Sequence, residues 1–153
     1  MTITRAPRAM MDPAPGDWTM AWPGATAGLR PRGPVLAIAP FNFPLNLVAH
    51  KVAPAIAVGA PIIIKPAPST PLTALVLGEL LAETNLPVGS WSILPVGNDM
   101  APGMVADERM PVVSFTGSDV VGFNIQKAVP HKHITLELGG NAAALVLDDW
   151  SSD

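Results

Sequence analysis

The sequence of 153 residues contains no cysteine. This absence excludes disulfide bonds, thiolate metal sites and a cysteine nucleophile from these residues. Charge is also scarce, because 14% of the residues are charged, against about 25% in an average soluble domain. A chain with so little polar surface is expected to rest against more of its own protein or against a partner.

An excess of positive charge and long apolar runs are missing as well. The formal net charge is −3, which argues against a dedicated nucleic-acid binder, since such proteins usually carry a basic face. The most apolar stretch, residues 52–64, is interrupted by two prolines and a glycine, so no membrane span is expected. No apolar core follows Arg5 and Arg8, so no signal peptide is expected and the default location is the cytoplasm.

Proline is abundant, with 18 residues, and several prolines gather with glycines in residues 1–33. No apolar period runs through this segment, so we expect a flexible leader there. From residue 34 onward, short apolar runs alternate with helical stretches. Continuous apolar runs of this length are typical of strands buried in a parallel sheet.

The alternation predicts the order β-α-β-α-β-α-β-α-β. The fold class is therefore α/β, an open parallel sheet with helices on both faces, and we expect the apolar run of residues 142–147 to leave this sheet. Thr70 is expected to cap the second helix, with Pro71 at its first position, and Ser118 to cap the fourth. The expected strands are residues 35–39, 62–64, 91–96, 112–115 and 134–138, and the expected helices are 45–58, 71–84, 99–106 and 119–129.

Polar residues stand where the expected strands end. Open parallel sheets bind ligands beyond the carboxyl ends of their strands. Asn42 follows the first strand, Lys65 ends the second, Ser118 follows the fourth and Glu137 ends the fifth. We therefore expect an amide, an ammonium, a hydroxyl and a carboxylate at one edge of the sheet, which together form a candidate site.

Glu137 is the only charged residue between Lys132 and Asp148. A carboxylate in apolar surroundings has a raised pKa unless it is well hydrogen-bonded, and a raised pKa suits a general base that works near neutral pH. The alternative is a structural glutamate that accepts hydrogen bonds from backbone amides at the glycine turn. The residues alone favour neither interpretation.

Gly117 and Ser118 join a strand to a helix, and the free N–H groups of such a helix start suit a pyrophosphate. The GxxxxG spacing that ends at Gly122 is similar to a phosphate-binding loop, but Phe123 and Asn124 replace the Lys and Ser/Thr that this loop needs. Spacing alone therefore favours an ordinary strand–turn–helix.

Lys65 and Asn42 also have two interpretations each. Lys65 is either a solvated strand end or an anchor for an anion or hydroxyl of a ligand, and Asn42 is either a turn former or a donor to an oxyanion. The histidines, His50, His131 and His133, show no spacing typical of metal ligands, so no metal is expected.

Seven motifs occur in order along residues 31–149: Pro40-Phe41-Asn42-Phe43-Pro44, Lys51-Val52-Ala53-Pro54-Ala55, Lys65-Pro66, Thr70-Pro71-Leu72, Leu86-Pro87, Ser114-Phe115-Thr116-Gly117-Ser118 with Gly122, and Leu136-Glu137-Leu138-Gly139-Gly140. Their order and spacing resemble those of the NAD(P)-dependent aldehyde dehydrogenases. The resemblance implies a Rossmann-like dinucleotide-binding domain at residues 34–140, preceded by a weakly matching leader at 1–33. Residues 141–153 would begin the crossing into a catalytic domain.

The resemblance also implies roles for single residues. Asn42 resembles the amide that stabilises the thiohemiacetal oxyanion, and Glu137 matches the general base that activates the deacylating water. Lys65 is similar to the lysine bonded to the adenosine ribose, and Ser118 to the pyrophosphate contact. The implied cofactor is NAD or NADP, and the implied cofactor-binding residues are Pro40, Phe41, Lys65, Gly117, Ser118, Gly122, Leu138 and Gly139.

The family reaction converts an aldehyde, NAD(P)+ and water into a carboxylic acid and NAD(P)H through a cysteine thioester. The family cysteine lies well after the motif of Glu137, and this chain has none. We therefore expect a truncated enzyme of a homo-oligomeric family, inactive alone and self-associating through residues 142–147. The alternatives are a non-catalytic nucleotide-binding module or a residual fragment that needs a second chain. Pro68 stands where many NAD-preferring members carry a glutamate, so NADP is expected to be tolerated.

Overall fold

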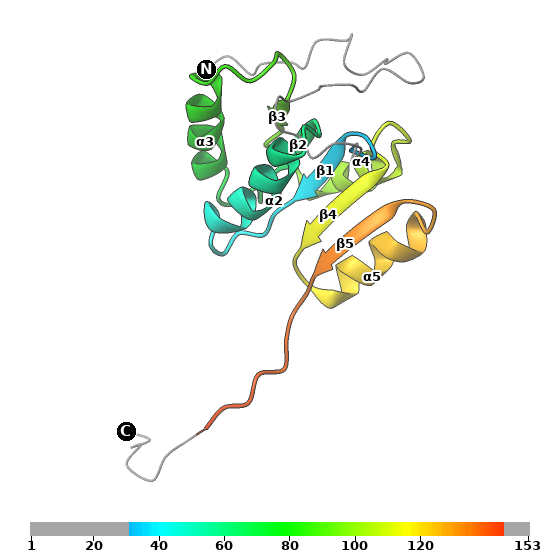
Figure 1. Ribbon diagram of the computed structural model, residues 1–153. Helices are drawn as coiled ribbons and strands as arrows, with labels where there is room; N and C mark the ends of the chain where they lie inside the picture. The colour runs from blue at the N-terminus through cyan, green and yellow to red at the C-terminus, as the bar shows by residue number, and fades with distance from the viewer. Residues whose placement is uncertain (1–30, 146–153) are drawn as a thin grey trace.

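The computed structural model describes residues 31–145. Its strands form one parallel sheet in the order β3-β2-β1-β4-β5 (Figure 1). The predicted α/β fold with an open parallel sheet is confirmed. The strands are β1 (Val35–Ile38), β2 (Ile62–Lys65), β3 (Trp91–Ile93), β4 (Val112–Thr116) and β5 (His133–Glu137), and the helices are α2 (Asn46–Ala57), α3 (Leu72–Ala82), the 3-10 turn η1 (Asn98–Met100), α4 (Ala101–Ala106) and α5 (Asp119–Ala128).

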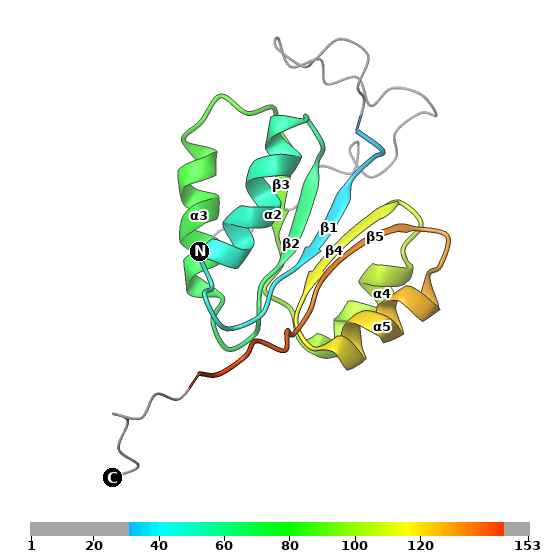
Figure 2. The ribbon, with the colours of Figure 1, turned by 60° about the horizontal axis from the view of Figure 1, so that its bottom comes forward.

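Alternate side chains of the central strand β1 enter two hydrophobic cores, one on each face of the sheet. Ala37, with Ala39 just after the strand, packs in the core that α2 and α3 cover. Leu36 and Ile38 pack in the core that α4 and α5 cover. Figure 2 shows the two helix pairs on opposite faces of the sheet, as the sequence predicts. Burial on both faces explains why β1 is a continuous apolar run.

The predicted cap of α3 is wrong. Pro71 occupies the N-cap position, and no side chain caps the first turn. The Thr70 hydroxyl instead donates a hydrogen bond to the Phe41 carbonyl oxygen, at 3.2 Å. The Thr70 hydroxyl therefore bonds to the loop after β1 instead of to the first turn of α3.

Ser118 occupies the N-cap of α5 as predicted, with an extended backbone, but its side chain makes no capping hydrogen bond. The third strand is shorter than predicted and ends at Ile93. One more ladder bond follows, from the Leu94 N–H to the Ile64 oxygen at 2.8 Å. The next N–H on that side, of Val96, bonds to the Leu94 oxygen at 2.8 Å instead of to β2, and the ladder ends there.

β5 lies at one edge of the sheet, and the segment after it runs away from the sheet (Figure 1). Residues 138–145 form no strand or helix, and Leu145 is 89% exposed. The apolar run predicted at 142–147 is thus described only to residue 145. The rest of it, and residues 1–30 of the predicted leader, lie outside the described residues, so the domain boundaries stay predictions. Within residues 31–145, no helix is long and apolar enough to cross a membrane.

Candidate functional site

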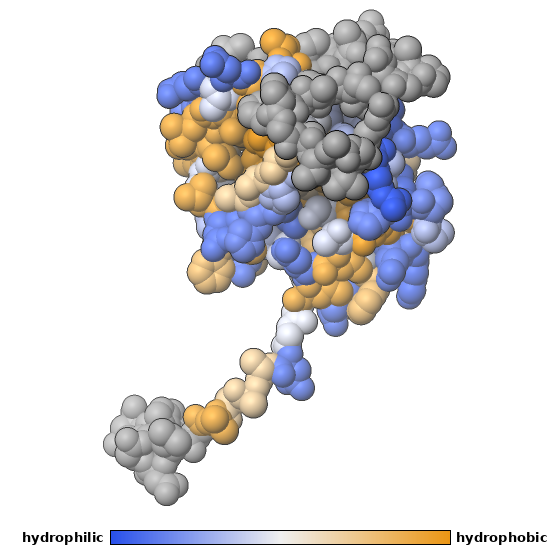
Figure 3. Space-filling model, in the orientation of Figure 1, coloured by the Kyte–Doolittle hydropathy of each residue, from blue (hydrophilic) through white to orange (hydrophobic). Residues whose placement is uncertain are grey.

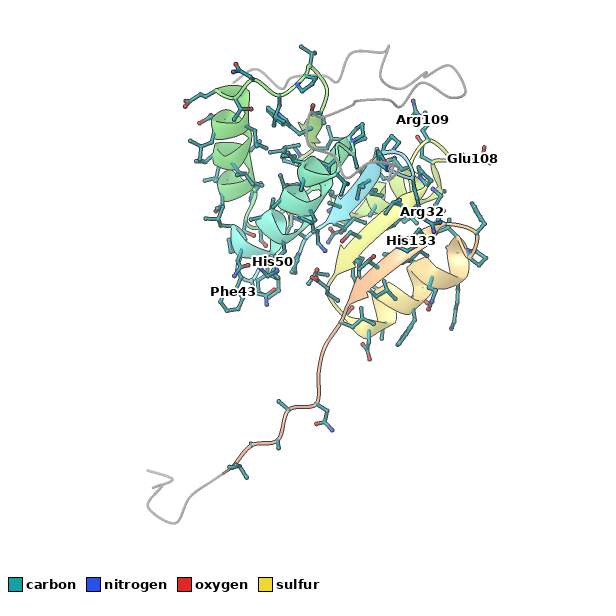
Figure 4. The ribbon with its side chains drawn as sticks, viewed as in Figure 1. Arg32, Phe43, His50, Glu108, Arg109 and His133 are labelled. Carbon is teal, nitrogen blue, oxygen red and sulfur yellow. The ribbon has the colours of Figure 1, made fainter. Side chains whose placement is uncertain are left out.

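The carboxyl ends of the parallel strands lie along one edge of the sheet (bottom of Figure 1). The register places Ile38 beside both Lys65 and Phe115, and Thr116 beside Glu137. Figure 4 shows Phe43 and His50 at this end of the molecule, and Glu108 and Arg109 at the opposite end. The strand ends and loops along this edge are called the carboxyl rim, and they comprise residues 39–45, 65–71, 94–98, 116–118 and 137–140.

Glu137 is the last residue of β5, and its carboxylate has two partners at the carboxyl rim. The hydroxyl of Thr116, from the paired position on β4, donates a hydrogen bond to Glu137 Oε2 at 2.5 Å. The ammonium nitrogen of Lys51, from α2, lies 3.7 Å from the same oxygen. Two strands and one helix thus fix this carboxylate.

These partners set the charge state of Glu137. The hydrogen bond from Thr116 lowers the pKa of the Glu137 carboxyl most, and the charges of Lys51 and His50 lower it further, against a smaller opposing effect of burial. The pKa of Glu137 is therefore lowered rather than raised, because the carboxylate is well hydrogen-bonded, which is the exception that the sequence prediction allowed. The side chain is 46% exposed, and a hydroxyl rather than backbone amides binds it, so Glu137 is ionised at neutral pH.

Lys51 is a buried cation. Its side chain is 2% exposed, and its ammonium donates a hydrogen bond to Ser114 Oγ at 2.9 Å. Burial lowers the pKa of Lys51, while Glu137 acts in the opposite direction. The lysine occupies the inward face of α2, together with Val48, Val52 and Ala55.

Lys65 ends β2 and is 1% exposed. Its ammonium donates a hydrogen bond to the side-chain oxygen of Asn98, at 2.8 Å, where η1 begins. Burial lowers the pKa of Lys65, and the charge of Asp99 opposes this shift. Two loops of the carboxyl rim, those after β2 and β3, are thereby joined through these side chains.

Asn42 lies in the loop that joins β1 to α2. Pro40 is half-buried in this loop, whereas Phe41 is 66% exposed. Phe43 has a φ of +48°, which is uncommon for a bulky residue and typical of strained functional loops. The Asn42 amide is exposed and has no hydrogen-bond partner among residues 31–145. The structure brings it to the carboxyl rim, without a contact to Glu137 or Lys65.

The segment that starts α5 is closely packed beneath the carboxyl rim. The Gly117 N–H donates to the Glu137 carbonyl at 3.1 Å, and a Cβ on Gly117 would lie 2.6 Å from the Phe115 ring. Gly122 is buried, and a Cβ there would lie 2.5 Å from Leu138. Gly122 thus lets α5 approach the end of β5, while Gly139 and Ser118 are exposed.

Comparison with known proteins identifies the family of this fold and rim. The sequence model named Aldehyde dehydrogenase family matches residues 23–153. The chain belongs to the aldehyde dehydrogenase family. It is 40% identical over 123 residues to aspartate-semialdehyde dehydrogenase 1 of Pseudomonas canavaninivorans, covering 80% of this chain and 26% of that protein. It is 44% identical to a lactaldehyde dehydrogenase of Methanocaldococcus jannaschii, covering 78% of this chain and 27% of that protein.

Solved aldehyde dehydrogenases have the same fold. Aldehyde dehydrogenase 21 from Physcomitrella patens, in complex with succinate, is 53% identical with a TM-score of 0.71, over 74% of this chain and 24% of that one. An aldehyde dehydrogenase of Mycobacterium tuberculosis complexed with NAD+ is 41% identical with a TM-score of 0.72, over 76% of this chain and 25% of that one. Glyceraldehyde-3-phosphate dehydrogenase GapN from Methanocaldococcus jannaschii, complexed with NADP, is 43% identical with a TM-score of 0.68, over 72% of this chain and 25% of that one. The chain thus spans about a quarter of the length of its relatives.

In this aldehyde dehydrogenase chain, reasoning from the sequence gave no role to three residues of the site: Lys51 on α2, and Thr116 and Asn98 at the rim. Lys51 had a local signal, because a lysine at an inward position of an apolar helix needs a buried partner. Thr116 and Asn98 had none, since their partners come from β5 and β2 and are set by strand order.

Proposed function

We propose that this chain binds NAD or NADP at the carboxyl rim and supplies an aldehyde dehydrogenase with its cofactor site, an oxyanion donor and a general base. The observation that carries the proposal is the ionised carboxylate of Glu137, held by Thr116 and Lys51 at the rim that also carries Lys65. The parent reaction oxidises an aldehyde to a carboxylic acid, and the nicotinamide cofactor supplies the hydride acceptor. NAD+ and NADP complexes of similar proteins support this choice of cofactor.

The residues of the rim fit an anionic dinucleotide. The Lys65 ammonium has three N–H donors, and one of them is used by Asn98. The Val120 N–H in the first turn of α5 donates to Asp119 Oδ1 at 2.8 Å, but Ser118 makes no capping bond there, so its hydroxyl and the remaining N–H groups suit a phosphate. Lys65 and Ser118 would hold the dinucleotide, and Gly139 is exposed for a close approach of the backbone.

Glu137 acts as the base that takes a proton from water. Thr116 and Lys51 both lie against Oε2, which leaves Oε1 to accept the proton. The lowered pKa keeps the carboxylate ionised at neutral pH, at the cost of weaker basicity. The free amide of Asn42 donates to the oxyanion of the substrate.

A second function, a nucleotide-binding module without its own catalysis, is favoured by the lack of any cysteine in 153 residues. Both functions require dinucleotide binding, and they differ in aldehyde oxidation. We expect no reduction of the cofactor by an aldehyde with the isolated chain, beyond that of E137Q. Reduction above this control would establish catalysis without a cysteine and overturn the expectation.

Calorimetric titration of the 153-residue chain with NAD+ and NADP+ tests binding. K65M is expected to weaken both dinucleotides at least tenfold, or about 1.4 kcal/mol. The matched control is K127M, since Lys127 is an exposed lysine in the last turn of α5. Absence of binding by the wild-type chain, or equal weakening in both variants, would contradict the proposed function.

A further inference from the structure

Asn98 and Lys65 form a pair whose remaining hydrogen-bonding groups are all donors. An ammonium has only donors, so its partner on Asn98 is the side-chain oxygen, at 2.8 Å. This bond leaves the NH₂ group of the exposed Asn98 side chain and two N–H groups of Lys65. A pair that offers only donors suits an anion with several acceptor oxygens.

No carboxylate neutralises this pair directly. Among the residues that the structure describes, no acidic oxygen lies within 4.0 Å of the Lys65 ammonium, as the ion pairs found involve Lys51 and Arg109. The neighbouring Asp99 acts on Lys65 only through its charge, and its carboxylate folds back toward Gly97. The donors of Lys65 and Asn98 therefore remain for a ligand.

The loop after β2, residues 66–71, contains no acidic residue. Pro68 and Ser69 are exposed directly after β2. A carboxylate at the ribose of a dinucleotide selects the 2′-hydroxyl of NAD, whereas cationic donors accommodate the 2′-phosphate of NADP. The ends of β2 and β3 here contribute the buried Lys65 cation, the Asn98 amide and the Ser69 hydroxyl, and the exposed Asp99 carboxylate follows Asn98.

We infer that Asn98 is a specificity-determining residue, which orients the Lys65 ammonium and joins it in binding the 2′-phosphate of an adenosine dinucleotide. This inference rests on the proposed function, because it names which dinucleotide that site prefers. Asn98 raises the affinity for the 2′-phosphate in two ways. Its oxygen holds the Lys65 ammonium at the rim, and its NH₂ group adds a second donor. An aspartate of the same shape would keep the contact to Lys65 and replace that donor with a negative charge.

The test uses two nucleotides that differ only at the ribose, adenosine 2′,5′-bisphosphate and 5′-AMP, titrated calorimetrically into the full chain. The wild-type chain is expected to bind the bisphosphate more tightly. N98D is expected to weaken the bisphosphate tenfold or more and 5′-AMP less than about threefold. N85D is the matched control, because Asn85 is an exposed asparagine between α3 and β3, at the opposite end of the strands. It is expected to leave the ratio of the two affinities unchanged.

N98A is a second variant that tests the role of Asn98 without adding a charge. It removes both the acceptor for Lys65 and the second donor, so the preference for the bisphosphate is expected to fall about threefold. Circular dichroism melts show whether both variants fold. If N98D does not fold, the test rests on the affinity ratio of N98A.

The outcomes separate this inference from the proposed function. If the wild-type chain binds both nucleotides equally, or if the variants weaken both equally, the specificity role of Asn98 is overturned while nucleotide binding stands. The same conclusion follows if N85D changes the ratio as much as N98D does. If the wild-type chain binds neither nucleotide, the proposed function and this inference fall together.

Discussion

The ammonium nitrogen of Lys51 lies 3.7 Å from Oε2 of Glu137, and the two side chains differ sharply in exposure, at 2% and 46%. The cation is buried on α2 and held by Ser114, so it cannot turn toward solvent. The carboxylate, in contrast, is partly exposed to solvent. A fixed buried charge thus acts on an accessible base, which makes Lys51 the positioning residue whose removal is most informative.

K51M is expected to raise the pKa of Glu137. Methionine preserves the apolar stem and removes the positive charge that stabilises the carboxylate, while the hydrogen bond from Thr116 remains. Titration of the Glu137 carboxyl carbon by NMR measures the change. K127M, at an exposed lysine of α5, is expected to leave the curve in place. Identical Glu137 curves for wild type and K51M would contradict the assigned role of Lys51.

The stability of the chain is expected to fall in acid. The pKa of Asp107 is lowered by hydrogen bonds from Arg109, and that of Glu137 is lowered by Thr116 and Lys51. A carboxyl group with a lowered folded-state pKa stabilises the protein above its unfolded pKa, about 3.9 to 4.3. This contribution is lost as the pH falls through the lower folded-state value. The free energy of unfolding, from urea titrations between about pH 2.5 and 7, should therefore decrease toward low pH.

D107N is expected to flatten this decrease more than E137Q. The Asp107 side chain is 25% exposed and that of Glu137 is 46% exposed, so solvent screens Glu137 more strongly. A D107N variant that loses stability in acid as steeply as wild type would show that the Arg109 contact does not shift this titration in solution.

Local sequence predicted the sheet well, because most of the strands are short apolar runs that can be recognised without knowing their neighbours. The continuous apolar run of β1 and the lysine that ends β2 needed no knowledge of neighbours. The four candidates Asn42, Lys65, Ser118 and Glu137 came from the rule that parallel strands share one functional edge. That rule holds whatever the strand order is.

Contacts that depend on strand order could not be predicted from the local sequence. Thr116 reaches Glu137 only because β4 and β5 are neighbours in register, and this hydrogen bond reversed the expected pKa shift of Glu137. Thr70 has an ordinary capping sequence, yet the Phe41 carbonyl competes for its hydroxyl. In both cases a tertiary partner outweighed a local preference.

K132M is expected to destabilise the chain by about 2 kcal/mol, since the Val105 carbonyl oxygen loses its ammonium donor and the Asp107 carbonyl oxygen keeps only the Met110 N–H. The buried Lys132 ammonium donates to the carbonyl oxygens of Val105 and Asp107, at 2.6 Å each, where α4 ends. The loss is measured by urea unfolding, with K127M as the exposed control. Equal stabilities of K132M and K127M would mean that water replaces these bonds at no cost.

Two glycines give a matched pair of alanine substitutions. G117A places a Cβ 2.6 Å from the Phe115 ring, whereas G103A, in α4, places one with nothing within 4 Å. We expect G117A to lose about 1 to 3 kcal/mol through overpacking, and G103A to be neutral or up to about 1 kcal/mol more stable because alanine favours helix. Thermal melts of both variants check this. A G117A variant as stable as G103A would show that the Phe115 ring moves aside freely.

The isolated chain is expected to self-associate through the segment that follows β5. β5 pairs only with β4 within residues 31–145, and an unpaired strand edge invites pairing with another chain. Figure 3 shows apolar residues along the extended segment beyond the sheet, where Leu145 is 89% exposed. Charged side chains, at 14% of the sequence, give little protection.

L145K tests this contact against a control of the same chemistry. Val88 is 80% exposed between α3 and β3, at the opposite end of the strands, so V88K also replaces an exposed apolar residue with lysine. A lysine in this exposed apolar segment opposes association through its charge and hydration. Light scattering during size-exclusion chromatography, over a range of concentrations, is expected to show smaller assemblies for L145K and unchanged ones for V88K. A wild-type chain that stays monomeric at every concentration would contradict the expected self-association. Equal effects of L145K and V88K would show that the segment after β5 is not the contact.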